Sequence, residues 1–139
     1  MKTELVIPSD LKFLTVVEEW LLGALRAEIA AGNPDWQKIE SRLRLVIVEV
    51  YSNVVRHAHQ DRPELPVLMK VTLKENLLLL EIWDQGRGFN LRDYSPPVPG
   101  DCCEGGYGWL ILYQLMDRVD YRLGIQGSLN CLILEKQLA

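Results

Sequence analysis

The chain has 139 residues, of which 48% are apolar and 24% charged, and 15 basic against 19 acidic side chains give a formal net charge of −4. This length suits one domain with its own core, and the composition excludes a disordered chain. The acidic balance argues against direct nucleic-acid binding, and no apolar run approaches the roughly 20 residues of a membrane span.

The first half of the chain predicts a short strand and two long helices. Residues 3–8 alternate as in a strand, and Ser9 suits the N-cap of the next element, with Asp10 in its first turn. Apolar residues recur at helical spacing over residues 10–30, where a Gly-Asn-Pro sequence ends the helix. Residues 35–59 fit a second helix, since their length and polar spacing outweigh the β-branched content that would also suit a strand.

The second half predicts two hairpins separated by a long loop and a helix. Strands at residues 67–75 and 77–84 are joined tightly around Glu75 and Asn76. A Gly- and Pro-rich segment then precedes the remaining elements, which are a helix at about 108–117 and strands at about 119–124 and 129–136. Because the strands pair as hairpins, we expect one α+β domain over residues 1–139. It is a two-layer sandwich with a mixed, mostly antiparallel sheet and helices on one face.

Three polar residues recur along the second helix in the sequence EVYSNVVRHAH. Glu49, Asn53 and His57 lie within about 80° of one another on one face, at the edge of the apolar stripe. Carboxylate and amide oxygens suit Mg²⁺, and a carboxylate there can also take a proton from a nucleophile. The alternative is a helix with three solvated polar side chains. His57 and His59 diverge by about 200° and therefore cannot share one metal ion.

A second motif, DQGRGF, follows an apolar strand. Asp84 at the strand end can accept a hydrogen bond from an exocyclic amino group such as that of adenine. Gly86 and Gly88, just before Phe89, let the backbone approach a flat ring. The alternative is an ordinary glycine-rich turn.

A third motif, EGGYGW, opens the apolar helix that follows the long loop. Gly105, Gly106 and Gly108, which flank Tyr107, leave backbone N–H groups free at a helix N-terminus, where the dipole favours phosphate. The alternative is a loop that merely begins a buried helix. The chain has no P-loop and no Rossmann fingerprint.

Together and in this order, the three motifs resemble the N-box, G1 box and G2 box of the GHKL ATPase superfamily. The small size and the sequence GGYGWLILYQLMDRVDY are most similar to the bacterial anti-sigma factor serine/threonine kinases. The resemblance implies a Bergerat-type ATP-binding fold with ATP and Mg²⁺ as cofactors, and an ATP lid at about residues 89–107.

The resemblance also implies site roles. Glu49 would be the general base, Asn53 the Mg²⁺ ligand, and Asp84 the partner of the adenine amino group. Gly106 and Gly108 would touch phosphate at the hinge of the lid. The implied nucleotide-binding set comprises Asn53, His57, Asp84, Gly86, Gly88, Phe89, Gly105, Gly106, Tyr107 and Gly108.

The chain departs from the family pattern in two places. The last strand of the family often carries a Thr near the adenine, where this chain has Asn130 and Cys131. The lid segment is Pro-rich and carries Cys102 and Cys103, which we expect to be free thiols of a cytoplasmic protein.

The resulting hypothesis is a protein kinase that transfers the γ-phosphoryl group of ATP to a Ser or Thr of a small antagonist protein and sequesters a sigma factor. A homodimer is also expected. One alternative is a nucleotide-gated binding module without phosphotransfer, and another is a structural domain without nucleotide. The retention of Glu49 favours the kinase, because a pure binding module needs no base.

Overall fold

The structure, a computed structural model, describes residues 1–29, 33–85, 107–125 and 129–138. In chain order the elements are β1 (Lys2–Pro8), a 3₁₀ turn (Leu11–Phe13), α1 (Leu14–Glu28), α2 (Trp36–Asn53), a π-helical turn (Val54–Ala58), β2 (Pro66–Lys74), β3 (Leu77–Gln85), α3 (Tyr107–Leu115), β4 (Arg118–Ile125) and β5 (Leu129–Gln137). No helix among these residues is long and apolar enough to cross a membrane.

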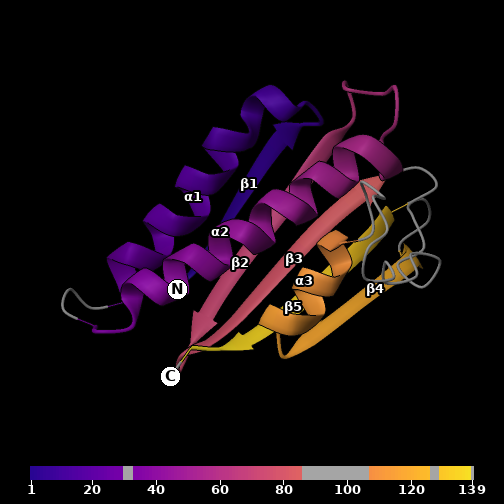
Figure 1. Cartoon of the computed structure of the whole chain (residues 1–139). Coiled ribbons are helices and arrows are strands. Elements are labelled where there is room, and N and C mark those ends of the chain that lie inside the picture. The colour runs from indigo at the N-terminus through magenta and orange to yellow at the C-terminus, as the bar shows by residue number, and fades with distance from the viewer. Residues whose placement is uncertain (30–32, 86–106, 126–128, 139) are drawn as a thin grey trace.

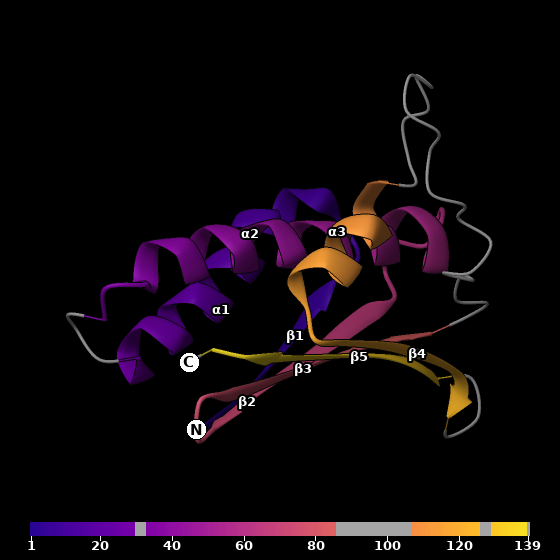
Figure 2. The ribbon, with the colours of Figure 1, turned by 60° about the horizontal axis from the view of Figure 1, so that its bottom comes forward.

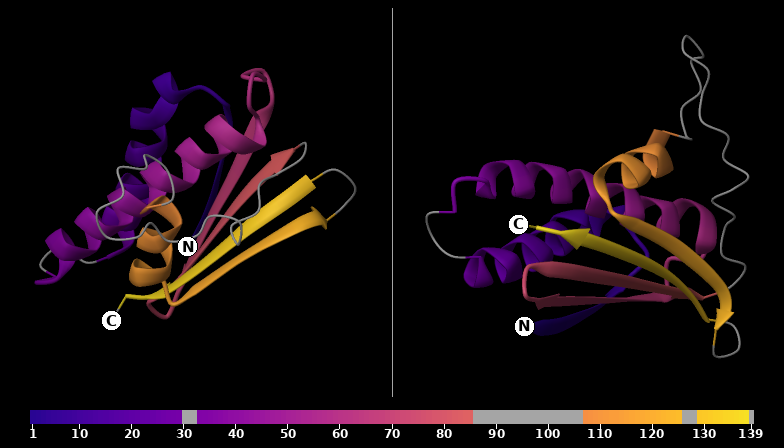
Figure 3. Two further views of the ribbon diagram at one scale, coloured as in Figure 1. Left: turned by 45° about the vertical axis from the view of Figure 1, so that its right-hand side comes forward. Right: turned by 90° about the horizontal axis from the view of Figure 1, so that it is seen from below.

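The strands form one sheet in the order β1-β2-β3-β5-β4, as Figure 1 shows. The three α-helices lie over one face of it, so the molecule has the two layers expected from the sequence (Figure 2, Figure 3). The predicted α+β class is therefore confirmed. The prediction of a mixed sheet changes in one respect, since each pairing of the described strands is antiparallel.

Strict alternation along the central strands decides which side chains enter the core. The fully buried side chains of β2 and β3 are Val67, Met69, Val71, Leu78, Leu80 and Ile82. These residues face the helices, because successive side chains of a strand point to opposite faces. The same alternation carries Asp84, the next inward position of β3, onto the helix-covered face.

The turn between β2 and β3 confirms the hairpin expected around Glu75 and Asn76. Lys74 pairs directly with Leu77, so the loop has two residues. Glu75 and Asn76 have φ angles of 51° and 65°, which is the pattern of a type I′ turn. Its twist matches that of the flanking strands, so this local sequence sets the register of the two central strands.

The start of the first helical segment differs from the expectation. Asp10, not Ser9, caps it: the Asp10 carboxylate accepts a hydrogen bond of 3.0 Å from the Lys12 backbone N–H. Ser9 is 3% exposed, and its hydroxyl lies 2.5 Å from Nδ1 of His59. The predicted N-cap was wrong because this hydroxyl is engaged in a tertiary contact.

The second helix also departs from a continuous α-helix over residues 35–59. α2 ends at Asn53, and the chain continues through the π-helical turn Val54–Ala58. The turn closes with a 2.8 Å hydrogen bond from the His59 N–H to the Val54 carbonyl. Such wide turns are rare and are frequent at functional sites.

Tyr51, on the buried face of α2, fixes the corner between β1 and α1. Its hydroxyl lies 2.5 Å from the carbonyl of Pro8 and 2.9 Å from that of Asp10, and it accepts a 3.2 Å hydrogen bond from the Asp10 N–H. Burial raises the pKa of this phenol above its usual value, so the hydroxyl stays protonated and able to donate. One side chain thereby satisfies backbone groups that no helix or strand pairs.

We expect Tyr51→Phe to lower the free energy of unfolding by about 1–2 kcal/mol, because buried carbonyl oxygens lose their donor without loss of ring packing. Urea denaturation measures this change. Ser41→Ala is the matched control, since it removes an exposed hydroxyl from the same helix and should change stability by less than about 0.5 kcal/mol. Equal unfolding midpoints for Tyr51→Phe and the wild type would contradict the assignment.

Candidate functional site

Three chain segments meet at one end of the molecule. They are the C-terminal end of α2, the C-terminal end of β3 and the N-terminal end of α3 (Figure 1, Figure 2). The π-helical turn contacts β3, and α3 packs against α2. Each of the three motifs singled out in the sequence has its described part at one of these segment ends.

Asp84 is the most completely buried acidic residue of the described chain, at 1% exposure. Both of its carboxylate oxygens are held: Oδ2 accepts a 2.6 Å hydrogen bond from the Tyr121 hydroxyl, and Oδ1 accepts one of 2.8 Å from Nδ2 of Asn130. Asn130 is itself fixed, because its Oδ1 accepts a 3.0 Å hydrogen bond from the Gly124 N–H. The carboxylate therefore has a defined orientation.

Strand register explains why these residues meet. Asp84 on β3 is directly opposite Asn130 on β5, and Tyr121 on β4 is opposite Leu132. Both Asn130 and Leu132 are buried inward positions of β5. The departure from the family pattern noted at Asn130 thus has a structural outcome, since this amide takes the place directly beside Asp84.

The electrostatics of Asp84 suit an acceptor for an amino group. Burial raises the pKa of this carboxyl, while the hydrogen bonds from Asn130 and Tyr121 act in the opposite direction. Each carboxylate oxygen has two acceptor positions, so a ligand N–H can still be accepted after the protein donors have bound. A buried, oriented acceptor of this kind fits the exocyclic amino group of adenine.

Glu49 and Asn53 occupy the last turns of α2, four residues apart on one helix face. Both side chains are half-buried, and within the described ranges neither makes a hydrogen bond or an ion pair. Their oxygens are thus available to a ligand at the same end of the molecule as Asp84. One or two protein oxygens completed by phosphate oxygens and waters is the usual coordination of Mg²⁺, so these residues fit that ion.

The two histidines have different environments. His57 is exposed on the π-helical turn, and partial burial together with the nearby Arg56 charge lowers its pKa. Its direction relative to Asn53 is set by this wide turn, not by the regular period of 100° per residue assumed from the sequence. His59 is 1% exposed and lies between Ser9 and the backbone of Gln85.

The glycine motifs are only partly placed. Gly86, Gly88, Phe89, Gly105 and Gly106 lie outside the described residues, as do Cys102, Cys103 and most of the expected lid. Tyr107 and Gly108 are the first residues of α3. The expectation that the third motif opens a helix is confirmed, and the phosphate contacts remain a prediction.

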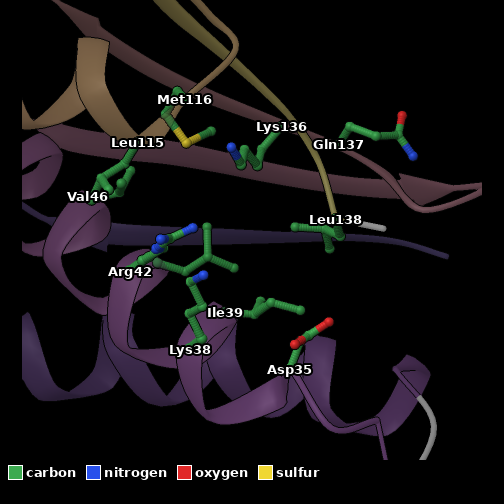
Figure 4. A pocket seen from close by; sticks show the side chains of 11 residues that line it. Asp35, Lys38, Ile39, Arg42, Val46, Leu115, Met116, Lys136, Gln137 and Leu138 are labelled. Carbon is green, nitrogen blue, oxygen red and sulfur yellow. The ribbon is translucent and has the colours of Figure 1, made fainter.

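Two hollows of the described chain lie away from these residues. One, of about 220 Å³, is at the other end of α2, where Lys38, Arg42 and Lys136 surround an apolar floor (Figure 4). The other, of about 310 Å³, includes Leu68 and Trp83. Neither contains Glu49, Asn53 or Asp84, so the candidate site is defined by its polar groups and not by the size of a hollow.

Sequence reasoning missed Tyr121, Ser9, Gln85 and the role of His59. A signal existed for Asn130, because a polar residue in the alternating apolar pattern of β5 must find a buried partner. No comparable signal marks His59. Its position depends on the π-helical turn, which a periodic pattern does not show.

The comparisons with known proteins agree with this geometry. The family described as "Histidine kinase-like ATPase domain" matches residues 8–136. An anti-sigma F factor of Bacillus cytotoxicus is 30% identical over 98 residues, which is 68% of this chain and just under two thirds, 66%, of that protein. A serine-protein kinase RsbW of Bacillus velezensis is 27% identical over 124 residues, or 84% of this chain and 74% of that protein. The chain belongs to the histidine kinase-like ATPase domain family.

Proposed function

We propose that this protein binds Mg-ATP between α2 and β3 and transfers the γ-phosphoryl group to a Ser or Thr of a small antagonist protein. The observation that carries the proposal is the buried Asp84 carboxylate, held by Tyr121 and Asn130 at the same end of the fold as Glu49 and Asn53. Family membership supports ATP as the nucleotide. The names of the two relatives support an antagonist protein and a sigma factor as partners.

Asp84 binds the adenine in this proposal. Its oriented carboxylate accepts the exocyclic amino N–H, and Asn130 and Tyr121 hold it in place without needing to move when the base arrives. A preorganised acceptor loses little conformational freedom on binding. It also rejects a purine that carries a carbonyl at the same position, because two acceptors would then face each other across a buried contact.

Glu49 and Asn53 act on the phosphate side. Asn53 supplies an amide oxygen to Mg²⁺, which when bound neutralises phosphate charge during transfer. Glu49 accepts the proton of the attacking Ser or Thr hydroxyl as its oxygen bonds to the γ-phosphorus and the bond from that phosphorus to the β–γ bridging oxygen breaks, which leaves ADP. A homodimer remains a prediction.

The first test concerns the base. Asp84→Asn keeps the size of the side chain but replaces an acceptor oxygen by a donor, and we expect calorimetry to show Mg-ATP binding weaker by about 10–100-fold. The wild type should prefer ATP to inosine triphosphate, which has a carbonyl in place of the amino group, and Asp84→Asn should reduce that preference.

Asp120→Asn is the matched control, because Asp120 is a carboxylate on β4 that pairs with Arg118 and Arg122. It should bind Mg-ATP as the wild type does. Absence of Mg-ATP binding by the wild type would overturn the proposed function. An unchanged ATP preference in Asp84→Asn would remove Asp84 from the base site.

The second test separates a kinase from a nucleotide-gated binding module. Glu49→Gln should bind Mg-ATP nearly as the wild type does and lose phosphotransfer by about 10²–10⁴-fold, the usual scale for a general base. Asn53→Ala should weaken Mg-ATP binding itself, since it removes an oxygen ligand. Radiolabel transfer to a small antagonist domain from the same organism measures the first effect, and calorimetry measures the second.

Glu19→Gln, an exposed carboxylate change on α1, serves as the control for both measurements. A wild type that binds Mg-ATP and the antagonist tightly but never transfers label is a binding module and not a kinase.

A further inference from the structure

We propose that His59 is a positioning residue for nucleotide binding, which holds the adenine-side strand β3 at a fixed place relative to the metal-side helix α2. This inference rests on the proposed function. His59 lies outside the set of residues expected to touch ATP, and its effect would pass through the backbone of Gln85.

The contacts of His59 join three segments that the apolar core does not tie together at this end. Its Nε2 accepts a 2.7 Å hydrogen bond from the Gln85 N–H, the residue that follows Asp84. Its Nδ1 lies 2.5 Å from the Ser9 hydroxyl, directly after β1. Its own N–H closes the π-helical turn that follows Asn53. One imidazole therefore connects the ends of β1, β3 and α2.

These contacts define the protonation state of the ring. A backbone N–H can only donate, so Nε2 must carry no proton, and the neutral ring then carries its proton on Nδ1 and donates it to Ser9. A protonated imidazole would direct a second N–H at the Gln85 N–H. The geometry thus requires neutral His59, and protonation would release the end of β3 beside Asp84.

The charged groups around His59 act in both directions. Arg62 on the following turn lowers its pKa and Glu64 raises it, while burial is the largest cause and lowers it below the ordinary 6.5. Asp10 and Asp84 adjoin its two partners along the chain. The folded protein therefore keeps His59 neutral at pH 7, and nucleotide affinity should fall as pH decreases through the lowered pKa.

The ring also contributes to stability in a defined pH range. Because the folded-state pKa lies below the unfolded value, this contribution is fully present above about pH 6.5 and is lost as pH falls toward the folded pKa. If the neutral ring positions Asp84, nucleotide binding favours the neutral form, and by reciprocity bound Mg-ATP must lower the pKa of His59 further.

The decisive experiment is a nitrogen-15 NMR titration of wild-type His59 with and without saturating Mg-ATP. We expect the Nδ1–H tautomer in both states and a lower pKa of His59 in the presence of nucleotide. An Nε2–H tautomer, or the same pKa in both states while Mg-ATP is bound, would overturn the proposal. A merely structural histidine would show no such shift.

Two variants divide the two side-chain hydrogen bonds. In His59→Gln the amide oxygen can replace Nε2 and accept from Gln85, whereas in His59→Asn the amide can replace only Nδ1 and contact Ser9. We expect calorimetry to show Mg-ATP binding about five- to tenfold weaker in His59→Asn than in His59→Gln, because only the former loses the bond to β3. Equal affinities of two folded variants would contradict the positioning role.

The pH profile identifies the histidine. His57→Gln leaves His59 as the sole histidine, so the fall in affinity at low pH should persist there and disappear in His59→Gln. The titration of ATP itself is common to both proteins and cancels. If the wild type binds no Mg-ATP, the proposed function fails. If it binds and the fall persists in His59→Gln, only the present inference fails.

Discussion

The burial of one carboxylate constrains the end of the sheet where the candidate site lies. Transfer of Asp84 from water to an inward position is unfavourable unless its oxygens are paired, and Tyr121 and Asn130 supply that pairing from two further strands. The register of β3, β5 and β4 must therefore be maintained at this end, because a shift of one residue would leave a buried polar group without a partner. The same contacts that stabilise the strands orient the carboxylate.

The helical layer is attached to this end of the sheet through polar contacts as well as through packing. Tyr51 binds backbone groups of the corner after β1, and His59 joins that corner to β3. Directional hydrogen bonds fix positions more narrowly than apolar contacts, which tolerate small shifts of volume and direction. This division places the apolar core beneath the helices and the oriented polar groups at the end where ligand oxygens and donors are needed.

Much of this arrangement could be predicted from periodicity, because helices, strands and the Glu75–Asn76 turn are determined by local sequence. Glu49, Asn53 and Asp84 could be selected from motifs, although their proximity to one another could not. The errors have a common cause. Ser9 has the chemistry of an N-cap, but its hydroxyl contacts a histidine 50 residues away. Such competition between local and tertiary partners leaves no periodic signal, and neither does the π-helical turn.

That wide turn makes the number of residues between Asn53 and His59 as important as their identities. A π turn accommodates one residue more than the α-helix would hold in the same length. Removal of any one residue from Val54–Ala58 would restore regular winding and rotate all that follows by about 100° relative to Asn53. The imidazole would then leave the space between Ser9 and Gln85. Relatives that share this bridge should therefore tolerate substitutions within the turn but no insertion or deletion.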